Sequence, residues 1–389
     1  MNLNIDFIPF AAPSIGPEEE EAVLAVLRSG WLTTGTVALE FEREFASFVD
    51  SENALAVNSA TSGLHLALEA LKVGPGDAVV TSPYTFTSTA AAARYLGAEV
   101  AFCDVLPGGY NMDPERLEEV LSRTRNAKVV IPVHVGGLPC RMKEILEISR
   151  RFGCAVIEDS AHAFPSKLPE GYAGTLGDVG VYSFYATKTI TTGEGGMVVT
   201  GDARLARRMS VMRMHGIDRQ VWDRYTSKTA SWRYAVTEAG FKYNLPDVLA
   251  AIGREQLKKA DRFLAERRAV AETYRRAFDP LPFVEPPPTG TGHAWHLYSL
   301  RLKPGSLRVD RDAFIEHLRE SGIGSSVHFI PLHLMPYWSK RYDLKPEDFP
   351  RALASFNQTV SLPIWQGMGA EKVGRVASAV TRLGESLLA

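Results

Sequence analysis

The chain has 389 residues, of which 45% are hydrophobic and 23% are charged, and its formal net charge is −2. This length exceeds what one hydrophobic core usually serves, so we expect two structural units. The near-neutral balance lacks the basic excess that nucleic-acid binding requires, which argues against that class of function.

The first 16 residues are interpreted as an N-terminal arm and do not resemble a secretory signal. Acidic Asp6 and two prolines stand where a signal peptide has a basic start and an apolar run. No later window approaches the roughly 18 consecutive apolar residues of a membrane span. We therefore expect a cytoplasmic protein that does not bind a membrane.

The three cysteines, Cys103, Cys140 and Cys154, cannot all pair with one another. None has the Cys/His spacing of a metal site, and no other residue cluster has zinc or magnesium spacing. We expect buried reduced thiols and no metal.

From residue 17 to residue 250, short β-branched apolar runs alternate with longer segments of helical period. That alternation is typical of a mainly parallel sheet covered by helices, so this range is predicted to be a doubly wound α/β domain. The expected strands cover residues 77–81, 99–104, 128–133 and 155–158. The expected helices include residues 63–70 and 142–151.

Residues 251–389 are predicted to form a smaller α+β domain. A long amphipathic helix is expected over residues 247–277, and it ends before a Pro/Gly-rich stretch that cannot continue it. Beyond this boundary we expect a strand at 293–302, a helix at 310–320, a turn and strand at 322–330, and a closing helix at 370–388. The charged segment DRYTSK at 223–228 is interpreted as a solvated loop.

The chemically informative residues are Asp159 and Lys188. Asp159 ends a predicted strand and Lys188 follows another, and in open α/β sheets such strand ends face the ligand crevice. A lysine that forms a Schiff base with an aldehyde, and a carboxylate that keeps a pyridine nitrogen protonated, are what pyridoxal phosphate requires. The alternative is a surface lysine and a strand-capping aspartate.

A candidate phosphate site lies at Ala60, Thr61 and Ser62, just before the predicted helix at 63–70. Hydroxyls and free backbone N–H groups converge there at a positive helix N-terminus, which favours an anion. An ordinary Ser/Thr N-cap would look the same. The GEGG run at 193–196 lacks dinucleotide-binding spacing and leads into a strand, so we interpret it as a tight turn.

Several segments along the chain resemble the DegT/DnrJ/EryC1/StrS sugar aminotransferases. They are NSATSGLHLAL, TSPYTFTSTAAAARYLGAEVAFCDV, IPVHVGG, VIEDSAHA, YSFYATKTITTGEGGMVVT and GFKYNLPDVLAAIGREQL. SGWLTTG, HAWHL and GIGSSVHF further resemble the enzymes that aminate UDP-linked 4-keto-pentoses. The resemblance implies an aspartate-aminotransferase-like fold (PLP fold type I), with a seven-stranded, mainly parallel sheet in the large domain and a small C-terminal α+β domain.

The resemblance also implies roles around pyridoxal 5'-phosphate. Ala60, Thr61 and Ser183 correspond to residues that hold the phosphate. Phe86 corresponds to an aromatic residue that lies against the pyridine ring, with a core phenylalanine as the alternative. His162 corresponds to a residue near the phenolic oxygen, although a lone histidine is commonly structural.

Four further correspondences concern the partner subunit and the sugar. Asn244 matches an asparagine that reaches the neighbouring subunit's cofactor phosphate, which implies a homodimer with shared active sites; an N-cap is the alternative. His328 matches a histidine on the sugar side, or is a satisfied strand histidine. Trp31 and Thr33 fall where relatives approach the sugar, or belong to a turn that packs on the partner subunit.

These observations predict a PLP-dependent aminotransferase that moves the amino group of L-glutamate to a nucleotide-linked keto-sugar and releases 2-oxoglutarate. The expected position is C4 of a UDP-4-keto sugar, for polysaccharide or related amino-sugar biosynthesis. A PLP-dependent sugar 3-dehydratase would resemble the family over the same length but carries histidine in place of the Schiff-base lysine. A non-catalytic PLP-binding regulator would lose the lysine or the phosphate site, and this chain has both.

Overall fold

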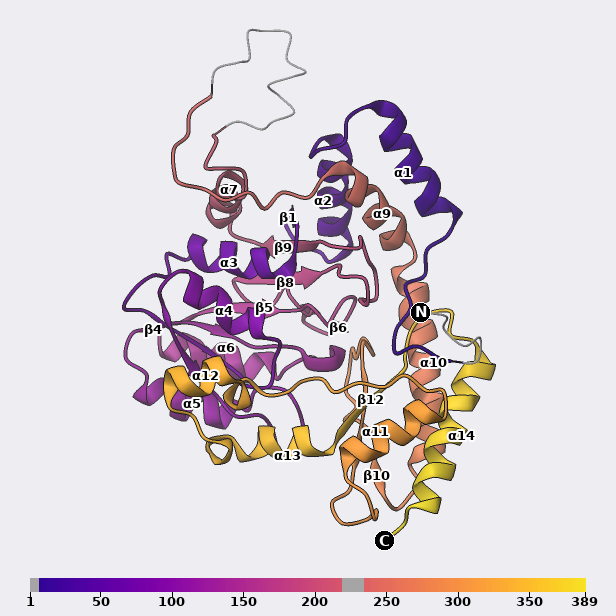
Figure 1. Ribbon diagram of the computed structural model, residues 1–389. Coiled ribbons are helices and arrows are strands. Elements are labelled where there is room, and N and C mark those ends of the chain that lie inside the picture. Colours follow the sequence, from indigo (N-terminus) through magenta and orange to yellow (C-terminus); the bar gives the residue numbers. More distant parts are fainter. Residues whose placement is uncertain (1–6, 219–233) are drawn as a thin grey trace.

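The computed structural model describes residues 7–218 and 234–389, and the DRYTSK segment lies outside them. A seven-stranded sheet in the order β1-β9-β8-β5-β4-β2-β3 forms the centre of the larger unit (Figure 1). Its strands are β1 (Asn53–Val57), β2 (Ala78–Thr81), β3 (Glu99–Phe102), β4 (Ala127–Ile131), β5 (Ala155–Asp159), β8 (Val179–Ser183) and β9 (Gly196–Thr200). The ladders from β3 to β8 are parallel, whereas β9 runs antiparallel to both β8 and β1.

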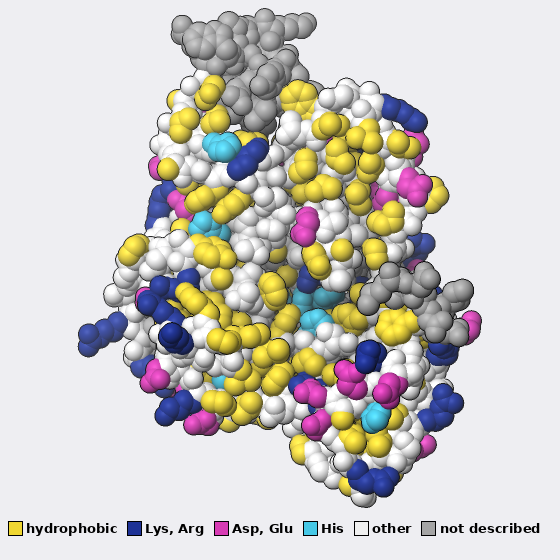
Figure 2. Space-filling view, in the orientation of Figure 1, with side chains coloured by type: hydrophobic (Ala, Val, Ile, Leu, Met, Phe, Trp, Pro, Cys, Tyr) yellow, Lys and Arg dark blue, Asp and Glu magenta, His cyan; other side chains and the backbone are white. Residues whose placement is uncertain are grey.

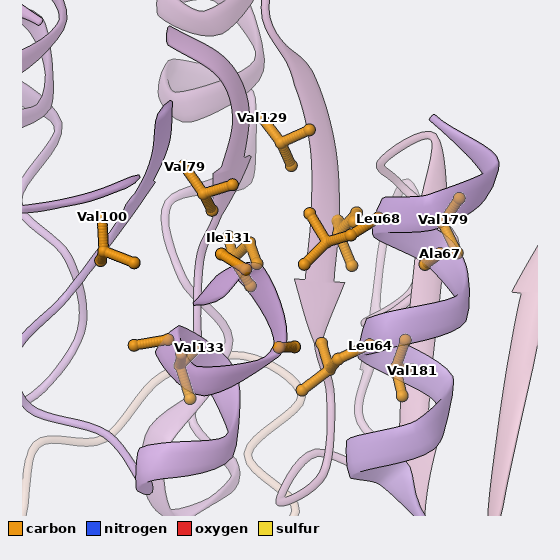
Figure 3. Close-up of a cluster of buried hydrophobic side chains, with 14 of the residues drawn as sticks. Leu64, Ala67, Leu68, Val79, Val100, Val129, Ile131, Val133, Val179 and Val181 are labelled. Atoms are coloured by element: carbon orange, nitrogen blue, oxygen red, sulfur yellow. The ribbon is translucent and has the colours of Figure 1, made fainter. Parts of the chain in front are cut away.

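Helices cover both faces of this sheet, as the continuous apolar character of its strands requires. On one face lie α3 (Ala60–Ala70), α4 (Thr87–Tyr95) and α7 (Ala203–Met212). The side chains of Leu64 and Leu68 on α3 point toward the strands that carry Ile131 and Val181 (Figure 3). Alternate strand residues face the opposite side, where α5 (Pro114–Arg123) and α6 (Met142–Arg151) pack.

At the β1 end of the sheet, three helices pack together: α1 (Pro17–Ser29), α2 (Thr36–Phe48) and α9 (Asp247–Lys258). The helix expected over 247–277 is in fact two, because Lys259 (φ −97°, ψ −3°) separates α9 from α10 (Ala260–Phe278). The first helix packs with the large unit. The start of α10, at Ala260 and Phe263, packs there too, whereas the rest of α10 packs with the second core.

The second core surrounds a three-stranded antiparallel sheet. Its strands are β10 (Val284–Glu285), β11 (Tyr298–Leu302) and β12 (Thr359–Leu362), and its other helices are α11 (Arg311–Glu320) and α14 (Ala370–Ser386). The N-terminal arm joins this core: Ile8 N donates to Gly322 O at 2.8 Å, and Gly324 N donates to Ile8 O at 2.8 Å. The expected strand within 322–330 is wrong, because that segment makes only isolated bridges, and the strand expected at 293–302 begins five residues later.

The chain returns to the larger unit before it ends. The helices α12 (Pro336–Tyr342) and α13 (Pro350–Gln358) bring Trp338, Phe349 and Ala352 into the apolar cluster of the seven-stranded sheet (Figure 1). We propose a division of the chain into a large domain (17–250) and a small domain (251–389). In this division, α12 and α13 belong to the small domain by sequence but pack on the large one.

The described cysteines are all buried and free. Among the described residues, no helix combines the length and hydrophobicity needed to cross a bilayer. The described ranges also contain a short hairpin of β6 (Lys167–Leu168) and β7 (Gly171–Tyr172), and short helical turns η1 (Val135–Gly137), η2 (Leu332–Leu334) and η3 (Pro346–Asp348).

Candidate active site

Asp159 is the last residue of β5 and is 4% exposed. Its Oδ2 accepts a hydrogen bond from Thr89 Oγ1 at 2.7 Å, and its Oδ1 accepts one from Ala161 N at 3.2 Å. Burial raises the pKa of this carboxyl group, while these hydrogen bonds and nearby Lys188 oppose the rise. The carboxyl group is therefore fixed in orientation. A further positive charge close to it would stabilise its ionised form.

Lys188 lies in the loop between β8 and β9, at the same edge of the sheet. Because β5 and β8 are parallel neighbours, their carboxyl ends bring Asp159 and the loop after Ser183 together. Burial lowers the pKa of the half-buried Lys188 amine to about 8, Asp159 opposes this change, and Arg267 adds to it. An amine of this kind is more readily available in its neutral, nucleophilic form than an exposed lysine.

Histidines gather beside Lys188, and Figure 2 shows histidine side chains near the centre of this face of the molecule. His162 Nδ1 accepts a hydrogen bond from Gly136 N at 3.3 Å, so the neutral ring carries its proton on Nε2. The ring centroid of His296 lies 4.3 Å from that of His162. Burial holds the pKa of His162 well below its usual value, and Lys188 and His328 add to this effect.

His328 is at the edge of this group, in the irregular segment that follows α11. Its Nδ1 lies 3.1 Å from Ser361 Oγ, and its ring stacks on Phe10 of the N-terminal arm at 5.0 Å. Burial lowers its pKa to about 4, with Lys188 adding to the shift. The alternative of a strand histidine is wrong, because residue 328 is not in a strand.

The candidate phosphate site is the first turn of α3. The helix begins at Ala60 rather than at Gly63, so Ala60 and Thr61 are helical residues and Ser59 is the N-cap. Ser59 Oγ accepts from Ser62 N at 3.1 Å, and Ser59 O accepts from Gly63 N at 3.1 Å. The cap therefore leaves the N–H groups of Ala60 and Thr61 for an incoming anion.

One glycine, Gly196, and one serine, Ser183, lie next to this turn. A Cβ at Gly196 on β9 would lie 2.8 Å from Ala60 N, so only glycine permits this close approach. Ser183 ends β8, and its Oγ accepts from Tyr185 N at 3.4 Å. A phosphate-sized anion thus fits the backbone donors at the start of α3, with a hydroxyl on the neighbouring strand end.

Phe86 is 60% exposed and directly precedes α4. Its ring centroid lies 6.2 Å from that of Phe329, in a tilted arrangement. The alternative of a core phenylalanine is wrong, because the ring is largely open to solvent. Phe329 also stacks on His162 at 5.5 Å, so Phe86 is an exposed ring close to the histidines and is suited to stacking on a planar ligand.

Asn244, Trp31 and Thr33 belong to a neighbouring cluster at the β1 end of the sheet. Asn244 Nδ2 donates to Thr34 Oγ1 at 2.6 Å, Trp31 Nε1 donates to Thr34 O at 3.3 Å, and Thr33 O accepts from Asp247 N. The N-cap alternative for Asn244 is wrong, since Pro246 occupies that position in α9. Asn244 pairs as an isolated bridge with Val57, three residues before α3.

Some residues of the site were missed from sequence. Thr89 orients Asp159 from α4, His296 packs on His162, and Arg267 lies near Lys188 on α10. Arg267 could have been found, because it falls on the apolar stripe of its helix between Phe263 and Tyr274.

Across the described ranges, no group of three or more His, Cys, Asp or Glu side chains is arranged to hold a metal ion.

A family model for the DegT/DnrJ/EryC1/StrS aminotransferase family matches residues 13–381. The spore coat polysaccharide biosynthesis protein SpsC of Bacillus subtilis is 42% identical over 377 residues, which cover 96% of each chain. Helicobacter pylori PseC, an aminotransferase involved in the biosynthesis of pseudoaminic acid, has a similar structure (TM-score 0.90, 28% identity, 98% of this chain and 100% of that chain).

The structure of Spr1654 of Streptococcus pneumoniae in its PLP form has a TM-score of 0.89 with 28% identity, and the match covers 98% of this chain and 100% of that chain. The same protein has also been determined in its PMP form. The aspartate-aminotransferase-like fold, with its seven-stranded sheet, is therefore confirmed. The chain belongs to the DegT/DnrJ/EryC1/StrS aminotransferase family and is a PLP-dependent sugar aminotransferase.

Proposed function

We propose that this enzyme transfers the amino group of L-glutamate to a nucleotide-linked keto-sugar, at C4 of a UDP-4-keto sugar. The observation that carries the proposal is the arrangement of Asp159 and Lys188 at one sheet edge beside buried neutral histidines. The names of SpsC and PseC, which concern polysaccharide and pseudoaminic acid biosynthesis, support a sugar as the acceptor. The product would serve polysaccharide or related amino-sugar biosynthesis.

Each proposed residue has a role that its contacts allow. Pyridoxal phosphate supplies an aldehyde that accepts the amino group and a ring that delocalises a carbanion. Asp159, held by Thr89, would keep the pyridine nitrogen protonated, and Lys188 would hold the aldehyde covalently and move a proton on the substrate side. His162 would donate from Nε2 to the phenolic oxygen, because Gly136 N occupies its Nδ1.

The proposed binding site for the cofactor phosphate combines the first turn of α3 with Ser183. Phe86 would cover the pyridine ring from its exposed position, and His328, Trp31 and Thr33 would contact the sugar. We further propose a homodimer in which Asn244 reaches the partner's phosphate, and a cytoplasmic location, which the three buried free thiols support.

A panel assay tests this function. Purified enzyme with PLP and glutamate is given UDP-, GDP- and dTDP-linked 4-keto and 3-keto sugars, and 2-oxoglutarate release is measured. We expect the greatest kcat/KM with a UDP-linked 4-keto sugar, and no release from the Lys188→Ala control because that variant lacks the amine. Activity confined to 3-keto sugars would overturn the substrate assignment, and dehydration without glutamate consumption would indicate the 3-dehydratase.

A further inference from the structure

Arg267 on α10 is a cation inside the protein. The residue is 1% exposed and is the largest of the fully buried side chains. No carboxylate of the described ranges lies within ion-pair distance of its guanidinium group. A buried charge without a counter-ion is unfavourable unless neutral dipoles surround it, so the contacts of this side chain need a physical explanation.

The guanidinium group is held by neutral oxygen atoms alone. Its Nε donates to Gln366 Oε1 at 3.1 Å. Its Nη1 lies within hydrogen-bond distance of three carbonyl oxygens, those of Trp295 (3.2 Å), His296 (3.3 Å) and Ile364 (3.0 Å). These contacts provide acceptors for Nε and Nη1 but leave the positive charge uncompensated, in contrast to the carboxylate pairs that many surface arginines form.

The contacts of Arg267 lead directly to the segment that carries Lys188. Gln366, whose Oε1 accepts from Arg267, donates from Nε2 to Thr189 O at 3.3 Å, and Thr189 follows Lys188 in the chain. Gln366 and Thr189 are both buried. A glutamine amide can accept on one side and donate on the other, which suits it to this bridge.

We propose that Arg267 is a positioning residue for Lys188, which fixes the Lys188 segment through Gln366 and keeps a positive charge near that segment at neutral pH. The proposal rests on the proposed role of Lys188 and adds α10 to the elements that form the site. Arg267 also holds the His296 carbonyl, so the same side chain fixes the histidine that packs on His162.

The electrostatic part of this role agrees with the titration of Lys188. Burial is the main cause that lowers the pKa of its amine to about 8, Asp159 acts in the opposite direction, and Arg267 acts in the same direction as burial. The charged and titratable groups around Lys188 are Asp159, His162, His296, His328 and Arg267. Burial keeps the three histidines neutral near pH 7, so Asp159 and Arg267 determine the local field.

The experiment measures the reactivity of the Lys188 amine in the full-length chain without cofactor. An amine-acylating reagent is applied from pH 6 to pH 10, and labelling of Lys188 is followed by peptide mass spectrometry. In Arg267→Met the labelling midpoint should move up by roughly 0.5–1 pH unit, because removal of a nearby cation favours the ammonium form. In Arg267→Lys, which retains the charge, the midpoint should stay close to that of the wild type.

Two further variants separate the bridge from the charge. Gln366→Leu keeps the cation but breaks the link to Thr189. The pH midpoint of Lys188 labelling should therefore equal that of the wild type, while kcat falls several-fold at unchanged KM. Arg268→Met makes the same replacement at the next, exposed residue of α10 and should change neither quantity. If Arg267→Met does not fold, Arg267→Gln, which is neutral and retains donors, replaces it.

An unchanged midpoint in a folded neutral variant would overturn the electrostatic role, as would an equal shift in Arg267→Lys. A Gln366→Leu enzyme with wild-type turnover would overturn the positioning role. Since labelling requires no sugar and no glutamate, the outcome for the Arg267 variants is independent of the panel assay, whereas the Gln366→Leu turnover is measured with a sugar that the enzyme aminates. An enzyme that aminates none of the tested sugars would disprove the proposed substrate, yet its Lys188 would still report the charge of Arg267.

Discussion

At the scale of single residues, the half-buried amine of Lys188 makes the stability of the cofactor-free protein depend on pH. Its pKa in the folded chain is about 8, whereas the ordinary value is 10.5. Protonation of this amine therefore costs more free energy in the folded chain than in the unfolded chain. This cost lowers the stability of the folded state below about pH 8, and it disappears as the pH rises to 10.5. The direction is opposite to that of a lysine stabilised by an ion pair.

We expect Lys188→Met to raise the free energy of unfolding at pH 7 by roughly 1–3 kcal/mol more than it does at pH 10.5, after a discount for the partial exposure of the side chain. Urea unfolding of the apoprotein at both pH values measures this difference. Lys143→Met on α6, at an exposed lysine, is the control and should show no such pH dependence. Equal effects of Lys188→Met at the two pH values would contradict the assigned environment.

Asp159→Asn tests the carboxylate that Thr89 orients. The amide has the same shape and can still accept from Thr89, but it cannot carry the charge that keeps a pyridine nitrogen protonated. Turnover should fall by about 100-fold or more, the usual scale for loss of a preorganised charge at a reacting centre. The measurement is kcat for 2-oxoglutarate release, and a value within a few-fold of wild type would remove Asp159 from this role.

At the scale of elements, Asp247 connects the start of α9 to the start of α2. It is 1% exposed, and it accepts hydrogen bonds from Gly35 N (2.7 Å), Val37 N (3.3 Å) and Ala38 N (3.0 Å). One carboxylate therefore caps a helix more than 200 residues away in sequence, which α2 needs because Gly35 offers no side chain as an N-cap.

Asp247→Ala should lower the free energy of unfolding by about 2–4 kcal/mol, because three N–H groups, two of them buried, lose their acceptor. Asp247→Asn should cost less, since its oxygen can still accept from Gly35 and Ala38, which share Oδ1 in the wild-type protein. Chemical denaturation compares the two variants. Equal losses from both would show that the hydrogen bonds at Oδ1 do not stabilise α2.

The elements also show what the sequence could and could not predict. The predicted helix at Met142–Arg151 has both bounds correct, and the predicted β5 lacks only its last residue, Asp159. Both elements are specified by local signals, namely their apolar periods and the turns that flank them. The break between α9 and α10 was not predicted, since Lys259 is neither glycine nor proline and its φ/ψ values stay close to helical. The sequence predicts a start at Gly63 for α3, whereas the helix begins at Ala60, because the side chain of Ser59 caps it three residues earlier.

The candidate site divides along the same line. The nearness of Asp159 and Lys188 follows from the rule that parallel strands end at one edge, so it could be predicted. The cap from Asp247 and the bridge from Arg267 to Thr189 join residues far apart in sequence, and no local pattern specifies them. The exposure of Phe86 likewise depends on tertiary packing, because its own segment is equally compatible with a core position.

At the scale of the whole molecule, the proposed homodimer can be tested by mixing two inactive or weak variants. If Asn244 reaches the partner's phosphate, a heterodimer of Asn244→Ala and Lys188→Ala chains has one site with both changes and one site with neither. Activity should then reappear after subunit exchange, to about half of the wild-type value per heterodimer. The measurement is 2-oxoglutarate release from differently tagged, co-purified chains.

The arrangement within one chain gives the opposite result. Asn244 lies beside Val57 of its own chain, close to the start of α3, and a role within one chain would act on its own site. Each site of the heterodimer would then keep one change, and mixing would restore nothing beyond the residual activity of Asn244→Ala. That outcome, with subunit exchange confirmed, or a monomeric active enzyme, would refute the shared site.

The return of α12 and α13 to the large sheet limits how this protein can be dissected. Trp338, Phe349 and Ala352 fill part of the core beside Phe102, although they are separated from it by more than 200 residues of chain. A fragment cut at residue 250 would expose this apolar surface to solvent, and its complement would carry two amphipathic helices with nothing to cover them. Split versions of the enzyme, or chimaeras that exchange only the C-terminal half with a relative, would therefore have to match these helices to the sheet on which they pack.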